Sequence, residues 1–237
     1  MEASALPPRH IRSYVRRSGR MTDGQRRAVD ALWVRFGVSE LPPRPERLFT
    51  AAGPCVLEIG FGNGEALVER ARGDLVRNYL GLEVHEPGVG HILLELARAE
   101  LTHVRVSRAD ASDALTIFED ASFAEICIWF PDPWPKKRHH KRRLVQGPTI
   151  AALARVLAPR GILHYATDDA EYAAQMALLT TAHGGFGLLD KDRCGRPVTR
   201  FERRARTVGR EVHDLRYQRL ERDERGSGVV NGFGGDR

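Results

Sequence analysis

Residues 55–64 read CVLEIGFGNG, a short apolar run followed directly by a turn that contains three glycines. The run is too short for most helices and is rich in Val, Leu and Ile, which predicts a buried strand over residues 55–59. Glycines after such a strand allow a tight turn and a close approach of the backbone to a ligand. The stretch therefore predicts the first unit of an α/β sheet, with a ligand-binding loop where its strand ends.

Outward from this stretch, apolar runs alternate with helical patterns. A helix that begins at Thr22 or Asp23 and ends near Phe36 precedes them. We predict further strands over residues 79–84, 104–107, 124–130 and 162–166, and helices over residues 65–72, 89–100, 144–157 and 170–183. Alternating strands and helices are typical of right-handed parallel crossovers. The sequence thus predicts a single-domain α/β fold, doubly wound and mostly parallel, with helices on both faces of the sheet.

The composition restricts the class of protein. The chain has 237 residues, a formal net charge of +6 and a pI near 9.6, which favours an anionic partner such as nucleic acid. We predict a mobile basic arm over residues 1–24, one folded domain over residues 25–225 and a flexible tail over residues 226–237.

Cysteines and apolar runs indicate the compartment. Three widely spaced cysteines form neither a disulfide framework nor a CxxC motif, and the histidines lack metal-ligand spacing, so no metal is expected. No run approaches the roughly 18 apolar residues that a membrane span needs. A cytoplasmic location without membrane contact is therefore expected, whereas the oligomeric state stays open between monomer and homodimer and no obligatory protein partner is implied.

Each predicted strand delivers a carboxylate to the same edge of the sheet. These carboxylates are Glu58, Glu83, Asp110, Asp132 and Asp168. Ligands of open α/β sheets bind outside the carboxyl ends of the strands. Glu65, close behind the glycines, would repel a pyrophosphate and disfavours a dinucleotide. The GxGxG spacing behind Glu58 instead resembles motif I of S-adenosylmethionine-dependent methyltransferases, whose ligand is cationic.

Two of these acids have alternative interpretations. Glu83 ends the second strand, where a carboxylate can accept both hydroxyls of a ribose; otherwise it is a surface glutamate. Asp110 is placed to reach an adenine amino group, or else it starts a helix.

Residues 131–143 read PDPWPKKRHHKRR, which places one carboxylate beside eight consecutive basic or histidine residues. The prolines stiffen the turn and should hold Asp132 in place. The basic run is either a solvated segment or an RNA contact, and its position beside a strand-end carboxylate favours RNA. Trp134 either stacks on a nucleobase or packs the proline turn.

Several motifs in order resemble one family. They are EIGFG (58–62), GLEVH (81–85), PGVG (87–90), FPDPWPKKRH (130–139), KRRLV (141–145), ATD (166–168) and RPVTRFE (196–202). The series resembles the bacterial tRNA (guanine-N7-)-methyltransferase family (TrmB type) of the class I S-adenosylmethionine-dependent methyltransferase superfamily. The resemblance implies a Rossmann-like sheet of seven strands. It also implies methyl transfer from S-adenosylmethionine to N7 of a guanosine in the tRNA variable loop, conventionally position 46.

The same resemblance implies roles for individual residues. The cofactor contacts would be Glu58, Gly60, Gly62, Glu83, Asp110 and Asp132, with Asp132 also catalytic. The substrate contacts would be Lys136, Asp168, Thr199, Arg200, Phe201 and Glu202. The RNA-binding segment would consist of Arg138, His139, His140, Lys141, Arg142 and Arg143.

Chemistry limits these roles further. Guanine N7 carries no proton at neutral pH, so Asp132 is expected to orient the base or stabilise developing positive charge rather than accept a proton. Asp168 with Glu171, and Thr199 with Glu202, also match the capping-box pattern and can each start a helix. The competing hypotheses are a non-catalytic RNA-binding protein and a methyltransferase for an exocyclic amine, for which the turn at Asp132 is only a partial match.

Overall fold

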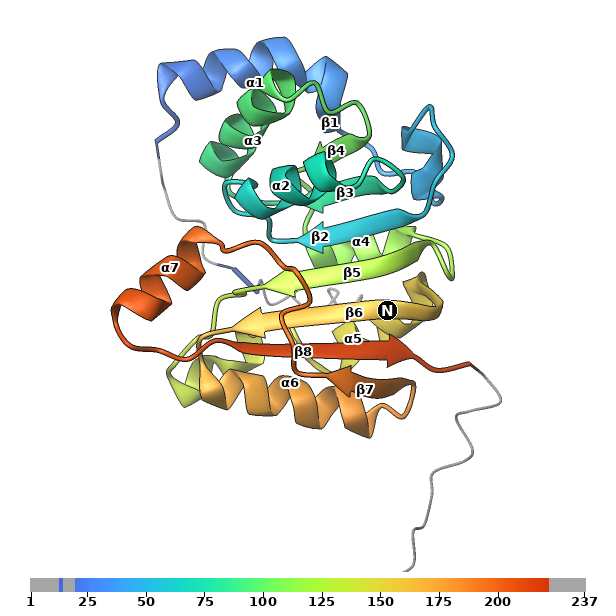
Figure 1. Ribbon diagram of the computed structural model, residues 1–237, viewed down its shortest axis with the longest axis vertical. Coiled ribbons are helices and arrows are strands. Elements are labelled where there is room, and N and C mark those ends of the chain that lie inside the picture. Colours follow the sequence, from blue (N-terminus) through green and yellow to red (C-terminus); the bar gives the residue numbers. More distant parts are fainter. Residues whose placement is uncertain (1–12, 15–19, 222–237) are drawn as a thin grey trace, which may run out of the picture.

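The computed structural model describes residues 13–14 and 20–221 (Figure 1). Most of the predicted basic arm (residues 1–24) and the whole predicted tail (residues 226–237) lie outside the described residues.

Eight strands of the described chain form one sheet in the order β1-β4-β3-β2-β5-β6-β8-β7. The strands are β1 (Gly37–Val38), β2 (Cys55–Ile59), β3 (Asn78–Leu82), β4 (Val104–Ser107), β5 (Phe123–Trp129), β6 (Leu157–Thr167), β7 (Phe186–Asp190) and β8 (His213–Arg219). β1 to β6 pair in parallel, and β8 runs antiparallel to both β6 and β7. The predicted single, mostly parallel sheet is confirmed.

The predicted number of seven strands is wrong by one. The additional strand is β1, whose Gly37 pairs with Val106 of β4 at the edge of the sheet. A strand of two residues is too short to produce an alternating or apolar pattern, so only its distant partner reveals it.

Helices cover both faces of the sheet, as predicted. They are α1 (Asp23–Phe36), α2 (Glu65–Gly73), α3 (Glu86–Arg98), α4 (Ala111–Ile117), α5 (Gly147–Val156), α6 (Ala170–Ala182) and α7 (Arg200–Thr207), with the 3-10 helices η1 (Pro45–Leu48) and η2 (Lys137–Arg142). Thr22 caps α1 in a capping box with Gln25, which confirms the predicted start of that helix.

Two apolar clusters hold the layers together. α1, α2 and α3 bury Phe36, Leu67 and Leu93 against one face, and α4, α5 and α6 bury Leu115 and their neighbours against the other. Strand β2 is buried along its whole length because successive side chains alternate between these two clusters. The short, mostly apolar run from which the strand was predicted is thus typical of a sheet covered on both sides.

The carboxyl ends of β2, β5 and β6 meet at one edge, beside α7 (Figure 1). β8 runs in the opposite direction, and the chain enters it from α7. The parallel strands and α7 therefore enclose the region where the sequence predicts a ligand. Within residues 13–14 and 20–221, no helix is both long and apolar enough to cross a membrane.

Candidate active site

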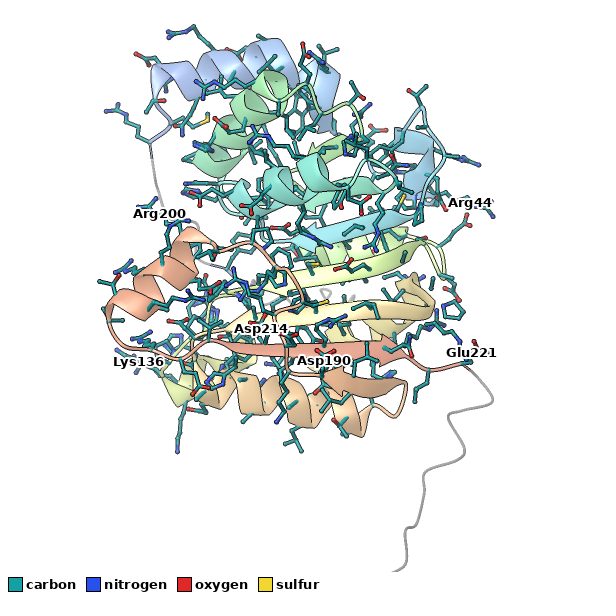
Figure 2. All side chains as sticks on the ribbon, in the orientation of Figure 1. Arg44, Lys136, Asp190, Arg200, Asp214 and Glu221 are labelled. Carbon is teal, nitrogen blue, oxygen red and sulfur yellow. The ribbon has the colours of Figure 1, made fainter. Side chains whose placement is uncertain are left out.

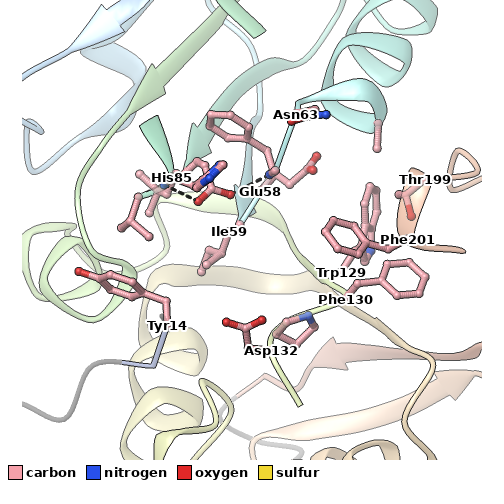
Figure 3. A pocket seen from close by; sticks show the side chains of 18 of the residues that line it. Tyr14, Glu58, Ile59, Asn63, His85, Trp129, Phe130, Asp132, Thr199 and Phe201 are labelled. Atoms are coloured by element: carbon pink, nitrogen blue, oxygen red, sulfur yellow. Dashed lines mark hydrogen bonds between the residues drawn. The ribbon is translucent and has the colours of Figure 1, made fainter. Parts of the chain in front are cut away.

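A pocket of about 420 Å³ lies at the carboxyl ends of the parallel strands. Of the residues selected from the sequence, it is lined by Glu58, Gly60, Gly62, Glu83, Asp132, Thr199, Arg200 and Phe201. Figure 3 shows the side chains of Glu58 and Asp132 around one cavity, with Tyr14 on one side and Thr199 and Phe201 on the other. Segments that are 185 residues apart in the chain, from Tyr14 to Thr199, thus share this pocket.

The glycine loop between β2 and α2 forms one wall. Gly60, Gly62 and Gly64 all have φ angles between 59° and 80°, a region that glycine adopts without strain. A Cβ atom on Gly64 would lie only 2.3 Å from the side chain of Ile92, whereas a Cβ on Gly60 would meet no atom within 4 Å. Gly64 is therefore needed for packing, and Gly60 leaves open space on the ligand side.

Glu83 fixes the loop from the neighbouring strand. Its two carboxylate oxygens each accept one backbone N–H at 2.8 Å, from Gly62 and from His85. Burial raises the pKa of Glu83, and these N–H donors oppose that rise. Each oxygen of a carboxylate can accept a second hydrogen bond, so Glu83 retains acceptor capacity for a ligand.

Glu58, the fourth residue of β2, is the most strongly perturbed carboxylate of the pocket. Its side chain is buried, and its Oε2 atom has no hydrogen-bond partner among the described residues. Burial raises the pKa of Glu58 to about 7, although the nearby Arg70 acts in the opposite direction. A buried acceptor without a partner is unfavourable in the protein alone and fits a site for a cationic or hydrogen-bond-donating ligand.

Behind Glu58 lies a small ionic cluster. Arg70 Nη2 donates to both carboxylate oxygens of Glu125 at 2.8 Å, and Arg77 donates to the same carboxylate at 2.6 Å. Arg70 also lies 3.1 Å from Cys127 Sγ. The pKa of Glu125 is lowered because these arginines outweigh its burial. Arg70 is therefore committed to Glu125 and contributes only electrostatically to Glu58.

The turn after β5 carries Asp132. Phe130 and Trp134, on either side of it, have left-handed φ angles of 52° and 48°. Such angles are strained in residues other than glycine and are concentrated at functional sites. Trp134 stacks on His139 at 5.8 Å, and its Nε1 donates to the Ser13 carbonyl. Trp134 does not line the pocket, and these contacts favour packing of the turn over stacking on a nucleobase.

Helix α7 forms another wall of the pocket. Thr199 caps it by accepting from the Glu202 N–H at 3.1 Å, as the capping-box pattern predicts. The ring of Phe201 is half exposed and lies nearly parallel to that of Phe130, with 6.3 Å between centroids. Thr199, Phe201 and Arg204 line the pocket, so the N-terminal part of α7 and its cap present polar, aromatic and cationic groups to it.

A buried ionic network holds α7 against the sheet. Arg196 donates to both oxygens of Asp214, at 2.8 and 2.9 Å, and to Glu202 Oε2 at 2.8 Å. His164 Nε2 lies 2.9 Å from Asp214, and Arg193 donates to the other oxygen of Glu202. The pKa of Asp214 falls to about 2 because these partners outweigh its burial. Glu202 is only 1% exposed, so the structure places it in this network rather than on the pocket surface.

The basic segment lies next to the pocket and not in its wall. The exposed residues Lys136, Lys137, Arg138 and Lys141 form its outer surface. His139 and His140 are half-buried, and Arg142 lies over the ring of Trp134 at 4.0 Å. Arg143 differs from all of these because it is buried and donates to the Pro133 carbonyl at 2.8 Å, where it supports the turn.

Asp110 and Asp168, two acids selected from the sequence, lie outside the pocket wall. Asp110 caps α4 by accepting from the Ser112 N–H at 2.7 Å, as the alternative interpretation proposed. Asp168 does not cap α6, because Asp169 accepts from the Tyr172 N–H instead. Asp168 pairs with Arg210 at 3.0 Å. Neither Asp110 nor Asp168 lines the pocket, although Ala109 and Ala111, on either side of Asp110, do.

Four important residues were not selected from the sequence. Tyr14 lies in the predicted mobile arm, and Arg196 was noted only as part of a motif. Trp129 lies in a predicted strand and Arg70 in a predicted helix, where neither was assigned a role in the site. An arginine that is flanked by glycine and proline in RCGRPV gives no sign of burial. Among the described residues, no group of three or more His, Cys, Asp or Glu side chains is arranged to hold a metal ion.

Solved structures share this fold. The 16S rRNA methyltransferase KamB superposes with a TM-score of 0.57 at 16% identity, over 74% of this chain and 92% of the other. The 16S rRNA (adenine(1408)-N(1))-methyltransferase from Catenulisporales acidiphilia gives 0.54 at 14% identity, over 78% and 96%. The chain therefore shares the fold of these rRNA methyltransferases.

Closer relatives identify the family. A family model described as a putative methyltransferase matches residues 52–215. The tRNA (guanine-N(7)-)-methyltransferase of Alkalilimnicola ehrlichii is 47% identical over 233 residues, covering 92% of this chain and 96% of the relative. That of Halorhodospira halophila is also 47% identical, covering 92% and 99%. The chain belongs to the tRNA (guanine-N(7)-)-methyltransferase family, and the resemblance noted in its motifs is confirmed.

Proposed function

We propose that the protein binds S-adenosylmethionine in this pocket and methylates N7 of the guanosine at position 46, in the variable loop of tRNA. The observation that carries this proposal is Glu58, a buried carboxylate that lines the pocket with one oxygen unpartnered among the described residues. Membership in a tRNA (guanine-N(7)-)-methyltransferase family supports the reaction. An RNA substrate also accords with a cytoplasmic location.

The chain offers suitable groups for both ends of the cofactor. Glu58 would accept from a donor on the cationic amino-acid part, and Glu83 would accept from ribose hydroxyls with its remaining lone pairs. Gly60 leaves space for close approach of the ligand to the backbone. Asp110 caps α4, so we assign any adenine contact of this loop to its neighbours Ala109 and Ala111, which line the pocket.

Asp132 would act at the point where cofactor and base meet. Bound S-adenosylmethionine supplies an electrophilic methyl group, and guanine N7 supplies a lone pair without loss of a proton. Asp132 therefore has no proton to remove. It would orient the guanine by accepting from its N–H edge and would stabilise the positive charge that passes onto the purine. The rigid turn between Phe130 and Trp134 supports this role, because alignment of the reacting atoms is a major source of acceleration.

The substrate would be held by α7 and by the basic segment. Thr199 and Phe201 face the pocket, where an exposed aromatic ring suits stacking on a purine. Lys136, Lys137 and Arg138 are exposed next to the pocket, where cationic side chains suit RNA phosphates. Arg143 and Glu202 would support these surfaces from within the protein, because both are buried and bonded to protein groups.

The test is incubation of unmodified tRNA with methyl-labelled S-adenosylmethionine, followed by nucleoside analysis. We expect 7-methylguanosine from a tRNA with guanosine at position 46 and none from the same transcript with adenosine there. Label in another nucleoside would contradict the assignment to N7, and label in both transcripts would contradict position 46.

Asp132→Asn provides the catalytic test in the same assay. We expect kcat to fall at least a hundredfold, while the Kd for S-adenosylmethionine changes much less, because the carboxylate acts mainly in the transition state. Asp120→Asn, at a distant exposed site, is the control. An undiminished kcat would rule out a catalytic role for Asp132.

A further inference from the structure

At the β1 edge of the sheet, an exposed arginine is stacked on a tryptophan. Arg108 is the residue that follows β4, and its Cζ atom lies 4.3 Å from the centroid of the Trp33 ring. Trp33 belongs to α1, and its Nε1 donates to Ser39 Oγ at 3.0 Å. A side chain at Gly37 would collide with the ring, so this glycine lets Trp33 pack directly against β1. The guanidinium of Arg108 therefore lies over a ring that is itself held in place.

The arginines of this edge lack acidic partners. Arg35 and Arg108 are exposed and form no hydrogen bond or ion pair with any residue that the structure describes. Arg105, within β4, donates to two backbone carbonyls. Burial and the nearby Arg35 lower the pKa of Arg105, as a neighbouring positive charge does. In contrast, Arg26 near the start of α1 pairs with Asp23 at 2.6 Å.

These three residues, here called the edge arginines, and the basic segment lie on opposite sides of the pocket. In the strand order β1-β4-β3-β2-β5, two strands separate β4, which ends before Arg108, from β5, which leads to the basic segment. Neighbouring strands lie about 4.8 Å apart, so the ends of β4 and β5 are separated by roughly 14 Å. Ala109 lines the pocket on the β4 side, and Asp132 lines it on the β5 side. Arg108 thus lies just outside the wall, next to Ala109.

The chemistry of the edge arginines fits a phosphate backbone. Guanidinium groups bind phosphate oxygens with planar forks of N–H donors. The Trp33 ring supports one face of the Arg108 guanidinium, which lowers the cost of ordering that side chain when it binds a ligand. The three arginines are spread along β1 and β4 rather than gathered around one cavity. An extended polyanion therefore fits this surface better than a small anion does.

We propose that Arg35, Arg105 and Arg108 form a docking surface for the body of the tRNA, beyond the nucleotides that enter the pocket. The proposal rests on the proposed function, since it takes tRNA as the RNA that is bound. RNA that crosses the pocket from the basic segment would pass Ala109 and reach the edge arginines. The enzyme would thereby hold more of its substrate than the loop that carries the target base.

The first test is the salt dependence of tRNA binding, measured without S-adenosylmethionine. Two phosphate contacts contribute about 1.4 to the slope of log Kd against log salt for a single strand, and about 1.8 with the value for duplex DNA. The double variant Arg35→Gln with Arg108→Gln should lose that amount. The ratio of its Kd to that of wild type should therefore shrink roughly sevenfold to twelvefold between 50 and 200 mM salt.

Arg44→Gln with Arg72→Gln is the charge-matched control. Both arginines are exposed, and Arg72 lies in the last turn of α2, away from the pocket. Figure 2 shows Arg44 at the edge of the molecule opposite Lys136 and Arg200. The control should leave the slope unchanged. Arg108→Lys keeps the charge and should retain most of the slope.

Steady-state kinetics separate docking from a role in the pocket. In the double variant of Arg35 and Arg108, the KM for tRNA at 50 mM salt should rise roughly tenfold or more. The kcat and the Kd for S-adenosylmethionine should stay close to those of wild type, because neither arginine lines the pocket. A short RNA that contains only the variable loop should bind both proteins equally, since it does not extend to the edge arginines.

The outcomes distinguish the two proposals. An unchanged slope in the double variant, with wild-type tRNA binding and methylation, would overturn the docking surface alone. A lower unfolding temperature without a change in slope would also overturn it, because Arg108 would then only pack on Trp33. Equal losses in the control variant would do the same by showing a long-range charge effect. Failure of the wild-type protein to bind or methylate tRNA would overturn the proposed function as well.

Discussion

Two arginines, the partly buried Arg70 and the buried Arg196, both lie over the ring of Trp129 and differ in how they pair with nearby acids. The Cζ atom of Arg70 lies 5.4 Å from the Trp129 ring, and that of Arg196 lies 5.8 Å away. Around Arg196, both oxygens of Asp214 and both of Glu202 accept hydrogen bonds. Around Arg70, Glu125 is paired in the same way, but Glu58 keeps an oxygen without a partner among the described residues.

The pKa values of the acids follow this difference. The pKa of Asp214 is lowered to about 2, whereas that of Glu58 is raised to about 7. Both carboxylates lose water on burial, so the direction of the shift depends on whether donors replace that water. A saturated cluster indicates a structural role, and an unsaturated carboxylate that lines a pocket indicates a ligand site. Arginine and carboxylate side chains thus stabilise the structure around Arg196, whereas around Arg70 they leave Glu58 available to bind a ligand.

The largest effect is expected for Arg196→Ala. It would leave Asp214 and Glu202 buried without their main partner, and removal of one member of a buried ion pair costs about 3–5 kcal/mol of unfolding free energy. Urea denaturation would measure the loss. Arg193→Ala is the control, because Arg193 contacts the same Glu202 from a partly exposed position and should cost less. Equal losses in both variants would contradict the central role of Arg196.

A smaller effect is expected in the pH dependence of stability. Because the folded-state pKa of Glu58 is raised, the folded protein binds its proton more tightly than the unfolded chain does. Stability from this group is therefore full below about pH 4.5 and is lost as the pH rises to about 7, by up to about 3 kcal/mol. Glu58→Gln should remove this fall, so the variant should equal or exceed wild type in stability at pH 8.

The pH dependence of stability that comes from Asp214 has the opposite sign to that from Glu58. The pKa of Asp214 is lowered, so its contribution is present above about pH 4 and is lost as the pH falls toward 2. Asp214→Asn should therefore be less stable than wild type at pH 7 and approach it in acid. Thermal unfolding from pH 3 to pH 8 would follow both variants. If the stability of the wild type relative to Glu58→Gln rose between pH 5 and pH 7, the assignment of Glu58 as a buried carboxylate with an unpartnered oxygen would be wrong.

Next in size is the effect of Glu58→Gln on the cofactor. A hydrogen bond to a charged group is worth about 1.5–3 kcal/mol, so the Kd for S-adenosylmethionine should rise roughly tenfold to a hundredfold. Isothermal titration at pH 8 would measure it. Glu69→Gln, on the same side of the sheet but outside the pocket, should bind as wild type does. Unchanged affinity in Glu58→Gln would remove the main support for the cofactor assignment.

The sequence predicted the parts of this arrangement that depend on local patterns. Fully buried parallel strands such as β2 are short, mostly apolar runs, and their carboxyl ends share one edge, so Glu58, Glu83 and Asp132 could be placed together before the fold was known. The N-cap at Thr199 was also readable because Thr199 and Glu202, whose N–H it accepts, are three residues apart.

What the sequence did not predict depends on distant partners. Arg196, in the loop before α7, pairs with Asp214, 18 residues away on β8, and no local pattern distinguishes it from the exposed arginines that follow. The same network draws Glu202 inward, away from the pocket surface. Asp168 and Asp169 differ by one position, and only backbone geometry selects Asp169 as the cap of α6. Tyr14 reaches the pocket from a segment whose composition predicted mobility.

The smallest effect is expected at Trp129, whose ring lies near both arginines. Trp129→Phe would lose part of the contact between the aromatic ring and both guanidinium groups, a loss of about 1 kcal/mol or less for such pairs. It would also remove an indole N–H that is buried without a partner among the described residues, which offsets part of that loss. The unfolding free energy should thus change by less than about 1 kcal/mol. A much larger loss would show that the ring couples the two clusters, and double variants with Glu58→Gln and with Asp214→Asn would then identify the side on which the coupling lies.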